Sequence, residues 1–352
     1  MAGYFAHELS AIPTSMFKDP VNLRKTVKSQ LTKELLDTVD WTVSHTAVTH
    51  KVIDGGWLLH KVKWQSGGVY QDILGQYGRY ILLHFGSNAT IVYDGYESGT
   101  STKDYEHMQR SAKCAPQIVF HIDTPAYSSQ SAFLGNQENK KAFVSLLMRH
   151  FESTGLSVTQ AEGDADTLIV RNAVNCAASG VPVTVVANDT DVLIMLLYHF
   201  QDSMEDITIH METTKQTPVR RLDIRKLASS LSQQVTQQLP VIHAISGCDT
   251  TSSLYGHGKA AVYRTVVNNK HAARLTAVLG CSGANAKDVV DAGLQLLVLI
   301  YGGKHGDSLN RMRYSTYMDI ISRSTLPPRP ERLPPTEGSA TQHVLCTHLQ
   351  AI

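Results

Sequence analysis

The chain has 352 residues, 42% of them hydrophobic, and a formal net charge of +1 from 32 basic and 31 acidic side chains. This balance excludes binding to nucleic acid or to an anionic membrane through overall charge, so any basic surface must be local. The five cysteines are odd in number and lack C-x-x-C spacing, which argues against a disulfide framework or a zinc finger. Without a signal-like N-terminus or a long apolar run, the sequence predicts a nuclear or cytoplasmic protein that is neither secreted nor bound to a membrane.

Residues 1–48 are predicted to form a basic, helical N-terminal extension. Apolar residues recur there at helical spacing, at Leu23, Val27, Leu31, Leu35 and Leu36. Residues 49–262 then alternate short β-rich runs with helical runs, which is typical of parallel βαβ units and predicts an α/β fold. The β-rich runs are residues 52–59, 80–85, 89–96 and 117–122.

The remaining elements follow from turn residues and helical periodicity. Residues 124–136 are rich in Ser with Pro and Gly, which indicates an exposed loop, and a helix is predicted over 138–154. Residues 263–325 are expected to be a helical C-terminal part. The segment 326–352 is expected to hold a proline-rich linker, residues 327–335, and a terminal helix.

Five aspartates close apolar runs at four separate places, and three further acidic residues open a predicted helix. The first group is Asp54, Asp94, Asp189, Asp191 and Asp249, and the second is Glu162, Asp164 and Asp166. A carboxylate at the end of a buried strand points into the crevice at the carboxyl edge of an open α/β sheet. Several such residues are therefore expected to converge.

A convergence of carboxylates predicts a metal centre. Hard divalent cations prefer oxygen ligands, and two ions about 3.5 to 4 Å apart are the usual arrangement for phosphodiester cleavage. Without a cation, each close pair of carboxylates would cost about 4 kcal/mol at an effective dielectric constant of about 20. The sequence therefore predicts two Mg²⁺ or Mn²⁺ ions.

Binding of a phosphate near so many acids requires nearby cations or backbone amides. Lys103 and Arg110 are seven residues apart on a predicted helix, which places them two turns apart on one face. Gly256 and Gly258 allow backbone amides to approach a phosphate at a helix start, with Lys259 beside them. These five residues are the predicted phosphate-binding set.

The order of these motifs resembles the flap-endonuclease branch of the PIN-like nuclease superfamily over about residues 50–262. The motifs are two Asp-Gly pairs, an acidic helix start, D-x-D, and Gly-Cys-Asp followed by G-x-G-K-A-A. The resemblance implies a three-layer α/β/α fold with a twisted, mainly parallel sheet and helical extensions at both ends. It also implies a metal-dependent nuclease that hydrolyses DNA, or less favourably RNA, by a two-metal-ion mechanism.

The same resemblance implies a role for each acid. Asp54 and Asp94 would be the N-terminal ligands, Asp189 and Asp191 the D-x-D pair, and Asp249 the last carboxylate. The acidic helix can be read as Glu162 with Asp164 or as Asp164 with Asp166, and the sequence Asp-Ala-Asp favours the second. Lys103 and Arg110 resemble the family's basic pair at the base of its arch, and residues 247–262 its helix-two-turn-helix.

A second resemblance and a departure from the flap-endonuclease pattern also bear on the function. Several segments, among them residues 244–261, are similar to uncharacterised, mobile-element-associated animal proteins. The short arch region, residues 114–136, lacks the strongly basic helices of well-studied flap enzymes. This leaves, as an alternative, a catalytically weak or inactive module that binds nucleic acid or a protein partner. A magnesium phosphotransferase that uses D-x-D would have no place for the G-x-G-K-A-A element.

Overall fold

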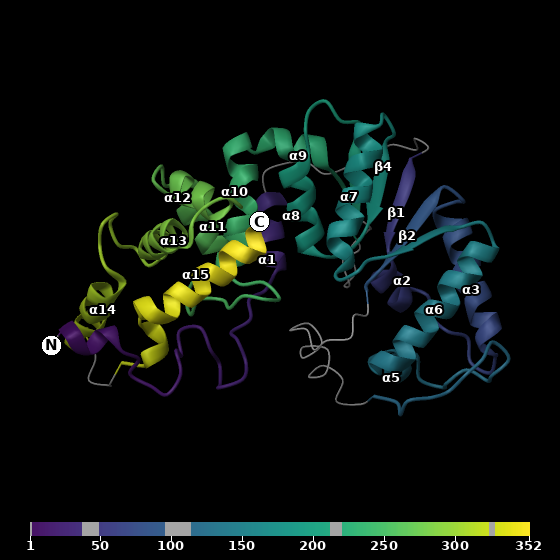
Figure 1. Cartoon of the computed structure of the whole chain (residues 1–352), viewed down its shortest axis with the longest axis horizontal. Coiled ribbons are helices and arrows are strands. Elements are labelled where there is room, and N and C mark those ends of the chain that lie inside the picture. The colour runs from purple at the N-terminus through teal and green to yellow at the C-terminus, as the bar shows by residue number, and fades with distance from the viewer. Residues whose placement is uncertain (1, 37–48, 96–113, 212–219, 324–327) are drawn as a thin grey trace. The chain divides into compact units, whose positions relative to one another are not determined.

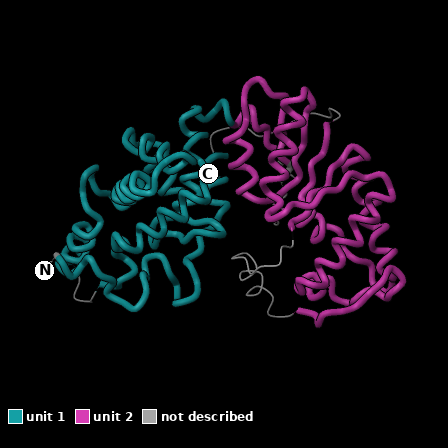
Figure 2. Tube along the Cα trace, in the orientation of Figure 1, with its two compact units in different colours: residues 1–39, 228–352 teal, residues 40–227 magenta. Residues whose placement is uncertain are grey.

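The computed structural model describes residues 2–36, 49–95, 114–211, 220–323 and 328–352. The chain divides into two compact units, shown in different colours in Figure 2. Unit 2 comprises residues 40–227, and unit 1 combines residues 1–39 with residues 228–352. Within the described ranges, every helix is too short or too polar to cross a bilayer. The division into four segments that the sequence predicts, residues 1–48, 49–262, 263–325 and 326–352, stays a prediction.

Unit 2 is built on a six-stranded sheet with the order β3-β2-β1-β4-β5-β6. Its strands are β1 (His50–Asp54), β2 (Ala89–Tyr93), β3 (Ser157–Gln160), β4 (Val183–Val186), β5 (Ile207–Met211) and β6 (Arg220–Asp223). All neighbours pair in parallel except β5 and β6. The central strands are buried on both faces, as in β4, where all four residues are buried. The predicted α/β class with a mainly parallel central sheet is confirmed.

Helices cover both faces of this sheet. The helices from α2 to α9 are α2 (Gly55–Lys61), α3 (Tyr70–His84), α5 (Gln130–Gly135), α6 (Gln137–Ser153), α7 (Ala165–Ala178), α8 (Thr190–His199) and α9 (Ile224–Ser230), and the last three residues of α9 belong to unit 1. Figure 1 shows α2, α3 and α6 on one side and α7 and α8 on the other. Ile53 and Ile91 form one core with Leu58, Tyr77 and Phe143 of the first group of helices. The predicted three layers are therefore present.

Three predicted elements of unit 2 differ from the structure. Residues 80–85 are the last part of α3 and not a strand, because Tyr77 and Ile81 bury one helical face while Leu83 stays 80% exposed. A short apolar run does not distinguish the two possibilities. Residues 117–121 form no regular element and residue 122 lies in a turn, so no strand is present there. The predicted loop 124–136 ends in α5, whose Phe133 is fully buried.

Unit 1 is helical. Its elements are η1 (Ala2–Ala6), α1 (Ser29–Leu36), α10 (Gln233–Ile245), α11 (Lys259–Val267), α12 (Ala272–Leu279), α13 (Ala286–Ile300), α14 (Leu309–Arg323), η2 (Pro330–Arg332) and α15 (Glu337–Ala351). The apolar run before Asp249 is therefore the end of helix α10 and not a strand. The N-terminal helix is also shorter than predicted, because only α1 is α-helical among the described residues before position 49.

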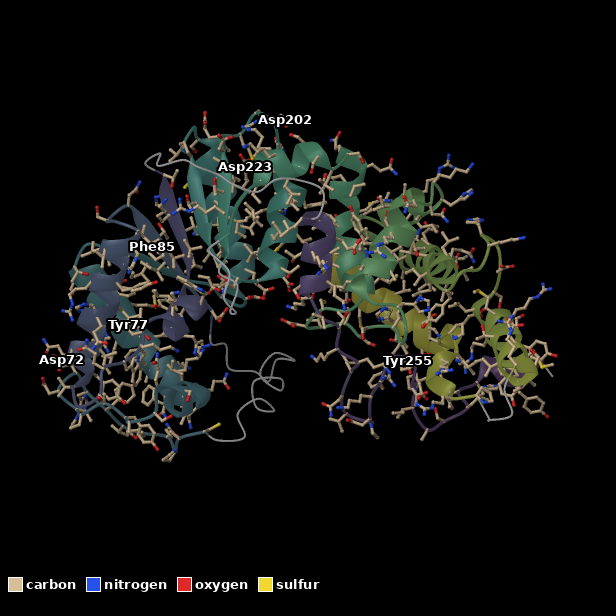
Figure 3. All side chains as sticks on the ribbon, turned by 180° about the vertical axis from the view of Figure 1, so that it is seen from behind. Asp72, Tyr77, Phe85, Asp202, Asp223 and Tyr255 are labelled. Atoms are coloured by element: carbon tan, nitrogen blue, oxygen red, sulfur yellow. The ribbon has the colours of Figure 1, made fainter. Side chains whose placement is uncertain are left out.

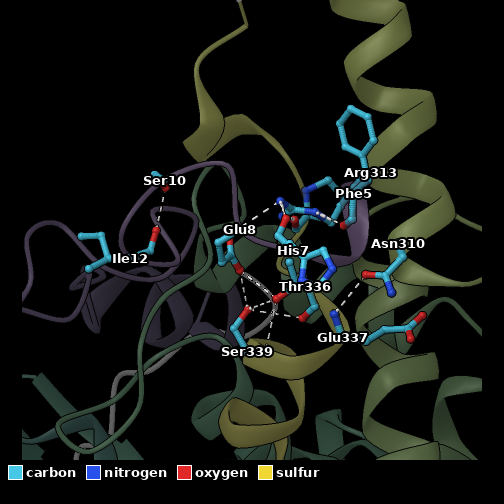
Figure 4. Close-up of polar contacts among 11 residues, drawn as sticks. Phe5, His7, Glu8, Ser10, Ile12, Asn310, Arg313, Thr336, Glu337 and Ser339 are labelled. Carbon is cyan, nitrogen blue, oxygen red and sulfur yellow. Dashed lines mark hydrogen bonds and ion pairs between the residues drawn. The ribbon is translucent and has the colours of Figure 1, made fainter. Parts of the chain in front are cut away.

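A buried arginine joins the N-terminal segment to the C-terminal part of unit 1 (Figure 4). Arg313 of α14 is only 2% exposed, and its guanidinium donates to the carbonyl oxygens of Phe5, His7 and Pro334. Glu8 lies 3.6 Å from the same guanidinium. The residues around Pro334 are buried, so the predicted proline-rich linker packs against unit 1.

Candidate metal centre

The carboxyl edge of the sheet has a topological switch point between β1 and β4. The chain runs outward from β1 through β2 to β3, and then returns to the other side of β1 as β4. Neighbouring connections therefore leave in opposite directions, which opens a crevice at the strand ends. Asp54 ends β1, Asp94 follows β2, and Asp189 follows β4, so all three aspartates lie at this edge.

Three of the predicted aspartates also begin helices. Asp54 Oδ1 accepts a hydrogen bond from Gly56 N (2.7 Å) at the start of α2. Asp164 and Asp189 cap α7 and α8 in the same way, accepting from the backbone N–H two residues later. This capping geometry explains the local sequence, because an N-cap carboxylate reaches the N–H of the second or third helical residue. The positive ends of three helix dipoles thus offset part of the negative charge.

The first turns of α7 and α8 bring three carboxylates together. One oxygen each of Asp166, Asp189 and Asp191 lies within 4.8 Å of the others, and all three residues are partly buried. We call these residues the carboxylate triad. The donor set consists only of carboxylate oxygens, which is the chemistry that Mg²⁺ and Mn²⁺ prefer. The residues therefore fit the predicted metal.

Asp94 and Asp54 flank the triad. Asp94 Oδ1 accepts from Ala165 N (3.1 Å), the first residue of the helix that carries Asp166. A methyl group built on Gly56 would lie 3.1 Å from Asp54 Oδ1 and 3.9 Å from Asp94 Oδ2, so both carboxylates border the same glycine.

The surroundings of Asp54 raise the pKa of its carboxyl. Burial, with a smaller contribution from the negative charges of Asp94 and Asp189, raises the pKa of this carboxyl from 3.8 to about 6, against hydrogen bonds from the backbone of Trp57 and Gly56. Asp54 is thus close enough to two other predicted ligands to interact with their charges. Its ionised form is unfavourable unless a cation is nearby.

The acidic segment before α7 divides into exposed and clustered residues. Glu162 and Asp164 are exposed, and the Asp164 carboxylate caps α7, whereas Asp166 belongs to the triad. Of the two readings of this segment, the geometry favours the one that includes Asp166.

Two hydrogen bonds that the sequence did not predict join the residues after β2 to residues 160–163. Gly95 N donates to Gly163 O (2.7 Å), and Gln160 Nε2 donates to Asp94 O (2.9 Å). A Cβ atom on Gly95 would lie 2.1 Å from the carbonyl oxygen of Glu162, so only glycine fits. The only sequence feature that indicated this close backbone contact was Gly95 in the second Asp-Gly pair. Gln160 carries no motif, and sequence reasoning missed it.

The other predicted residues lie elsewhere. Lys103 and Arg110 fall outside the described residues. Asp249 belongs to unit 1, where its carboxylate lies 3.0 Å from the Lys28 ammonium. Its role as a ligand stays a prediction.

The predicted phosphate loop also lies in unit 1. Gly256 has a φ of +78°, and Gly258 is the N-cap of α11. Lys259 is fully buried, and its ammonium donates to the His243 carbonyl oxygen at 2.9 Å. This lysine points into the core of unit 1 and presents no charge to a phosphate in this arrangement.

No protein-family model and no curated protein matches the sequence. Several solved structures are similar to it. The eukaryotic junction-resolving enzyme GEN-1 binding with potassium has 14% identity and a TM-score of 0.43, with 94% of this chain and 62% of that chain covered. The catalytic core of Rad2 in complex with DNA substrate has 14% identity and a TM-score of 0.37, with 85% and 73% covered. The T5 D15 protein co-crystallized with metal ions has 13% identity and a TM-score of 0.41, with 86% and 88% covered.

The chain spans about half the length, 48%, of another similar structure, the Holliday junction-resolving enzyme GEN1 in complex with product DNA and Mg²⁺, at 16% identity and a TM-score of 0.36. At these identities and TM-scores the similarities assign no residue role. The similar structures include junction-resolving enzymes and a catalytic core in complex with DNA substrate.

Proposed function

We propose that the chain is a metal-dependent nuclease that hydrolyses phosphodiester bonds at the carboxyl edge of the unit 2 sheet. The observation that carries this proposal is the carboxylate triad, with one oxygen each of Asp166, Asp189 and Asp191 within 4.8 Å. Asp54 and Asp94 border the same switch point from β1 and β2. Five carboxylates that end or follow four strands are more than helix capping requires.

The electrostatics of the cluster support binding of divalent cations. Two carboxylates about 4 Å apart repel each other by about 4 kcal/mol at an effective dielectric constant of about 20. Burial is the main cause of the raised pKa of Asp54, and the charges of Asp94 and Asp189 add to it, so the ionised carboxylate is unfavourable at this position. Bound cations would offset this cost, which favours Mg²⁺ or Mn²⁺ over an empty acidic cavity.

Each acid has a distinct role in the proposal. The triad and the flanking Asp54 and Asp94 hold two ions, which when bound stabilise the attacking and leaving oxygens of the phosphodiester. Asp164 fixes the first turn of α7 and thereby the position of Asp166. Asp249 is kept in the proposed ligand set through the motif resemblance.

Cations are needed to bring a phosphate to so acidic an edge. Lys103 and Arg110 remain the proposed phosphate clamps. In the described part of unit 2, a shallow hollow beside α2 and α3 is lined by Lys61, Lys63 and Arg79 together with apolar side chains. Because Asp54 is the N-cap of α2 and this helix is seven residues long, Lys61 at its end lies about 10 Å along the helix from Asp54. We propose that the hollow contacts the same substrate, with DNA favoured over RNA.

The test is cleavage of end-labelled single-stranded, duplex and flap DNA and of RNA with Mg²⁺ or Mn²⁺. Asp189→Asn and Asp191→Asn should abolish cleavage, because an amide keeps the shape and the capping acceptor but removes the charge. Asp223→Asn is the matched control. Asp223, which Figure 3 labels, also ends a strand, and its Oδ1 accepts from Lys226 N at the start of α9, but it is not part of the triad. It should cleave like the wild type.

A second readout separates the nuclease from the alternative, a catalytically weak or inactive module that binds nucleic acid or a protein partner. Addition of Mn²⁺ should raise the melting temperature of the wild type and of the Asp223 variant, but not that of Asp189→Asn. A metal-dependent shift without cleavage of any substrate would contradict the nuclease and support the binding module. Cleavage that survives in Asp189→Asn would exclude the triad as the site.

A further inference from the structure

Two loops of unit 1 meet through a pair of histidine rings. His271 precedes α12 and His305 follows α13, and their ring centroids lie 5.4 Å apart at an interplanar angle of 30°. The two helices pack against each other (Figure 1). The ring contact therefore places the start of α12 beside the loop that follows α13.

Both loops are fixed by hydrogen bonds of their own. His271 N donates to Asn269 Oδ1 at 2.9 Å. In the second loop, Lys304 N donates to Asp307 Oδ2 at 2.8 Å. Because the backbone is held in this way, the side chains of both loops project from a defined surface.

Three permanent cations lie close to the histidine pair in the sequence. Lys270 and Lys304 are the sequence neighbours of the two histidines, and Arg274 lies one turn beyond His271 on the same side of α12. All three side chains are exposed. We call Lys270, His271, Arg274, Lys304 and His305 the basic patch.

Two other cations of unit 1 have acidic partners. Arg264 pairs with Glu34 at 2.5 Å, and Arg313 pairs with Glu8. Across the described residues, by contrast, no carboxylate lies within ion-pair distance of Lys270, Arg274 or Lys304. An exposed group of like charges without partners is unfavourable by itself and attracts a polyanion.

Acidic groups on the adjoining elements do not cancel the charge. Helix α12 contains none, and the acids of α13, Asp288 and Asp291, lie in its first two turns, at the far end from the patch. Asp307 Oδ2 accepts a hydrogen bond from the backbone N–H of Lys304. Three cations and Asp307 sum to +2 with neutral histidines, whereas the whole chain carries only +1.

We propose that the basic patch is a second nucleic-acid contact, which binds backbone phosphates from unit 1 and is separate from the carboxylate cluster of unit 2. Its chemistry is that of spaced point charges without a base-reading pocket, so it contributes affinity and positioning but no sequence preference. The proposal rests on the proposed function only in the choice of nucleic acid as the polyanion.

Binding can be tested without cleavage. Anisotropy of a labelled DNA duplex is measured in EDTA over a salt series of roughly 50 to 200 mM, where phosphate contacts dominate the salt dependence. The patch variant is Lys270→Gln, Arg274→Gln, Lys304→Gln. The control variant, Lys33→Gln, Lys287→Gln, Arg329→Gln, removes the same charge from exposed positions elsewhere in unit 1.

The patch variant should bind more weakly, and its slope of log K against log salt should be smaller in magnitude by about 2 to 3, at about 0.9 for each lost phosphate contact. The control variant should keep the wild-type slope. Equal slopes in the two variants would overturn the proposal. A loss of binding to polyglutamate with DNA and RNA binding unchanged would also overturn it, in favour of an acidic protein partner.

Because EDTA prevents cleavage, the result stands whether or not the chain is a nuclease. A duplex RNA is measured beside the DNA, and parallel losses on both would show that phosphates are the recognised group. Melting temperatures of both variants within the range of the wild type confirm that the substitutions act on binding and not on folding.

Discussion

Asp54→Asn should stabilise the metal-free protein, although it removes a predicted metal ligand. In the folded chain the Asp54 carboxyl is partly buried and faces the charges of Asp94 and Asp189, which together raise its pKa to about 6. Asparagine has the same shape and keeps an oxygen that accepts from Gly56 N, so the cap of α2 is retained. Only the cost of the charge is removed.

The magnitude follows from the pKa. A change from 3.8 to about 6 corresponds to about 3 kcal/mol, at roughly 1.4 kcal/mol per pKa unit. An acid whose folded pKa lies above its unfolded value destabilises the fold once both states are ionised. Below pH 3.8 both states are protonated and the cost vanishes. It grows between pH 3.8 and about 6 and is complete near pH 7, so the variant should gain about 1 to 3 kcal/mol there.

The assay is urea unfolding followed by tryptophan fluorescence, in EDTA, at several pH values between about 4 and 8. All three tryptophans, Trp41, Trp57 and Trp64, belong to residues 40–227, so the signal reports on unit 2. Asp223→Asn is the control, because it replaces another strand-end cap with the same change of atoms. It should change the unfolding free energy by less than about 0.5 kcal/mol at every pH.

Two results would refute the reasoning. One is a loss of stability in Asp54→Asn near pH 7 in EDTA. The other is a gain that does not decrease as the pH falls towards 4, because a benefit independent of pH cannot come from removal of this charge. Addition of Mn²⁺ should reverse the order, since the wild type gains more from the cation than a variant with one ligand fewer.

Three other perturbations have defined outcomes. Arg313→Met should destabilise unit 1 by about 3 to 5 kcal/mol in circular-dichroism melts, because buried partners lose their cation, whereas the exposed Arg323→Met should cost less than about 1 kcal/mol; equal effects would contradict the buried network. Gly95→Ala should weaken Mn²⁺ binding in calorimetry because its Cβ meets backbone at 2.1 Å, while Gly163→Ala, with nothing within 4 Å, should bind normally. Burial lowers the pKa of His343, so the unfolded chain takes up a proton at a higher pH than the folded chain, and the wild type should lose stability as the pH falls from about 7 to 5. A His343→Gln variant whose stability falls with the same pH slope would exclude this residue as the cause of that loss.

Local patterns carried a large part of the information about unit 2. The strand ends at Asp54 and Asp94 and the helix starts at Asp164 and Asp189 follow from hydrophobic runs that stop at a capping residue, which is a short-range property of the chain. Parallel strands separated by helices follow from the same alternation. The α/β class and the positions of Asp54, Asp94 and Asp189 at or after the ends of strands of one sheet could therefore be predicted from the sequence.

The secondary structure of short apolar runs could not be predicted in this way. Residues 80–85 and 242–249 look like strands, yet the first segment is the last turn of α3 with its C-cap, and the second begins as the last turn of α10 and continues into a loop. Apolar runs of this length satisfy both periods, and packing against α6 and α15 respectively decides the outcome. Lys259 likewise reads as a phosphate ligand, and only the tertiary structure shows that its ammonium is buried beside His243.

The sequence by itself determined which residue types end the strands of unit 2, because capping and hydrophobic periodicity act over a few residues. Tertiary structure alone decided which of these acids meet. Asp166 joins Asp189 and Asp191 because α7 and α8 pack side by side, while Glu162, four residues earlier, faces solvent. It also decided that His271 and His305, 34 positions apart, share one basic surface. Such contacts depend on how helices pack, which no local pattern encodes.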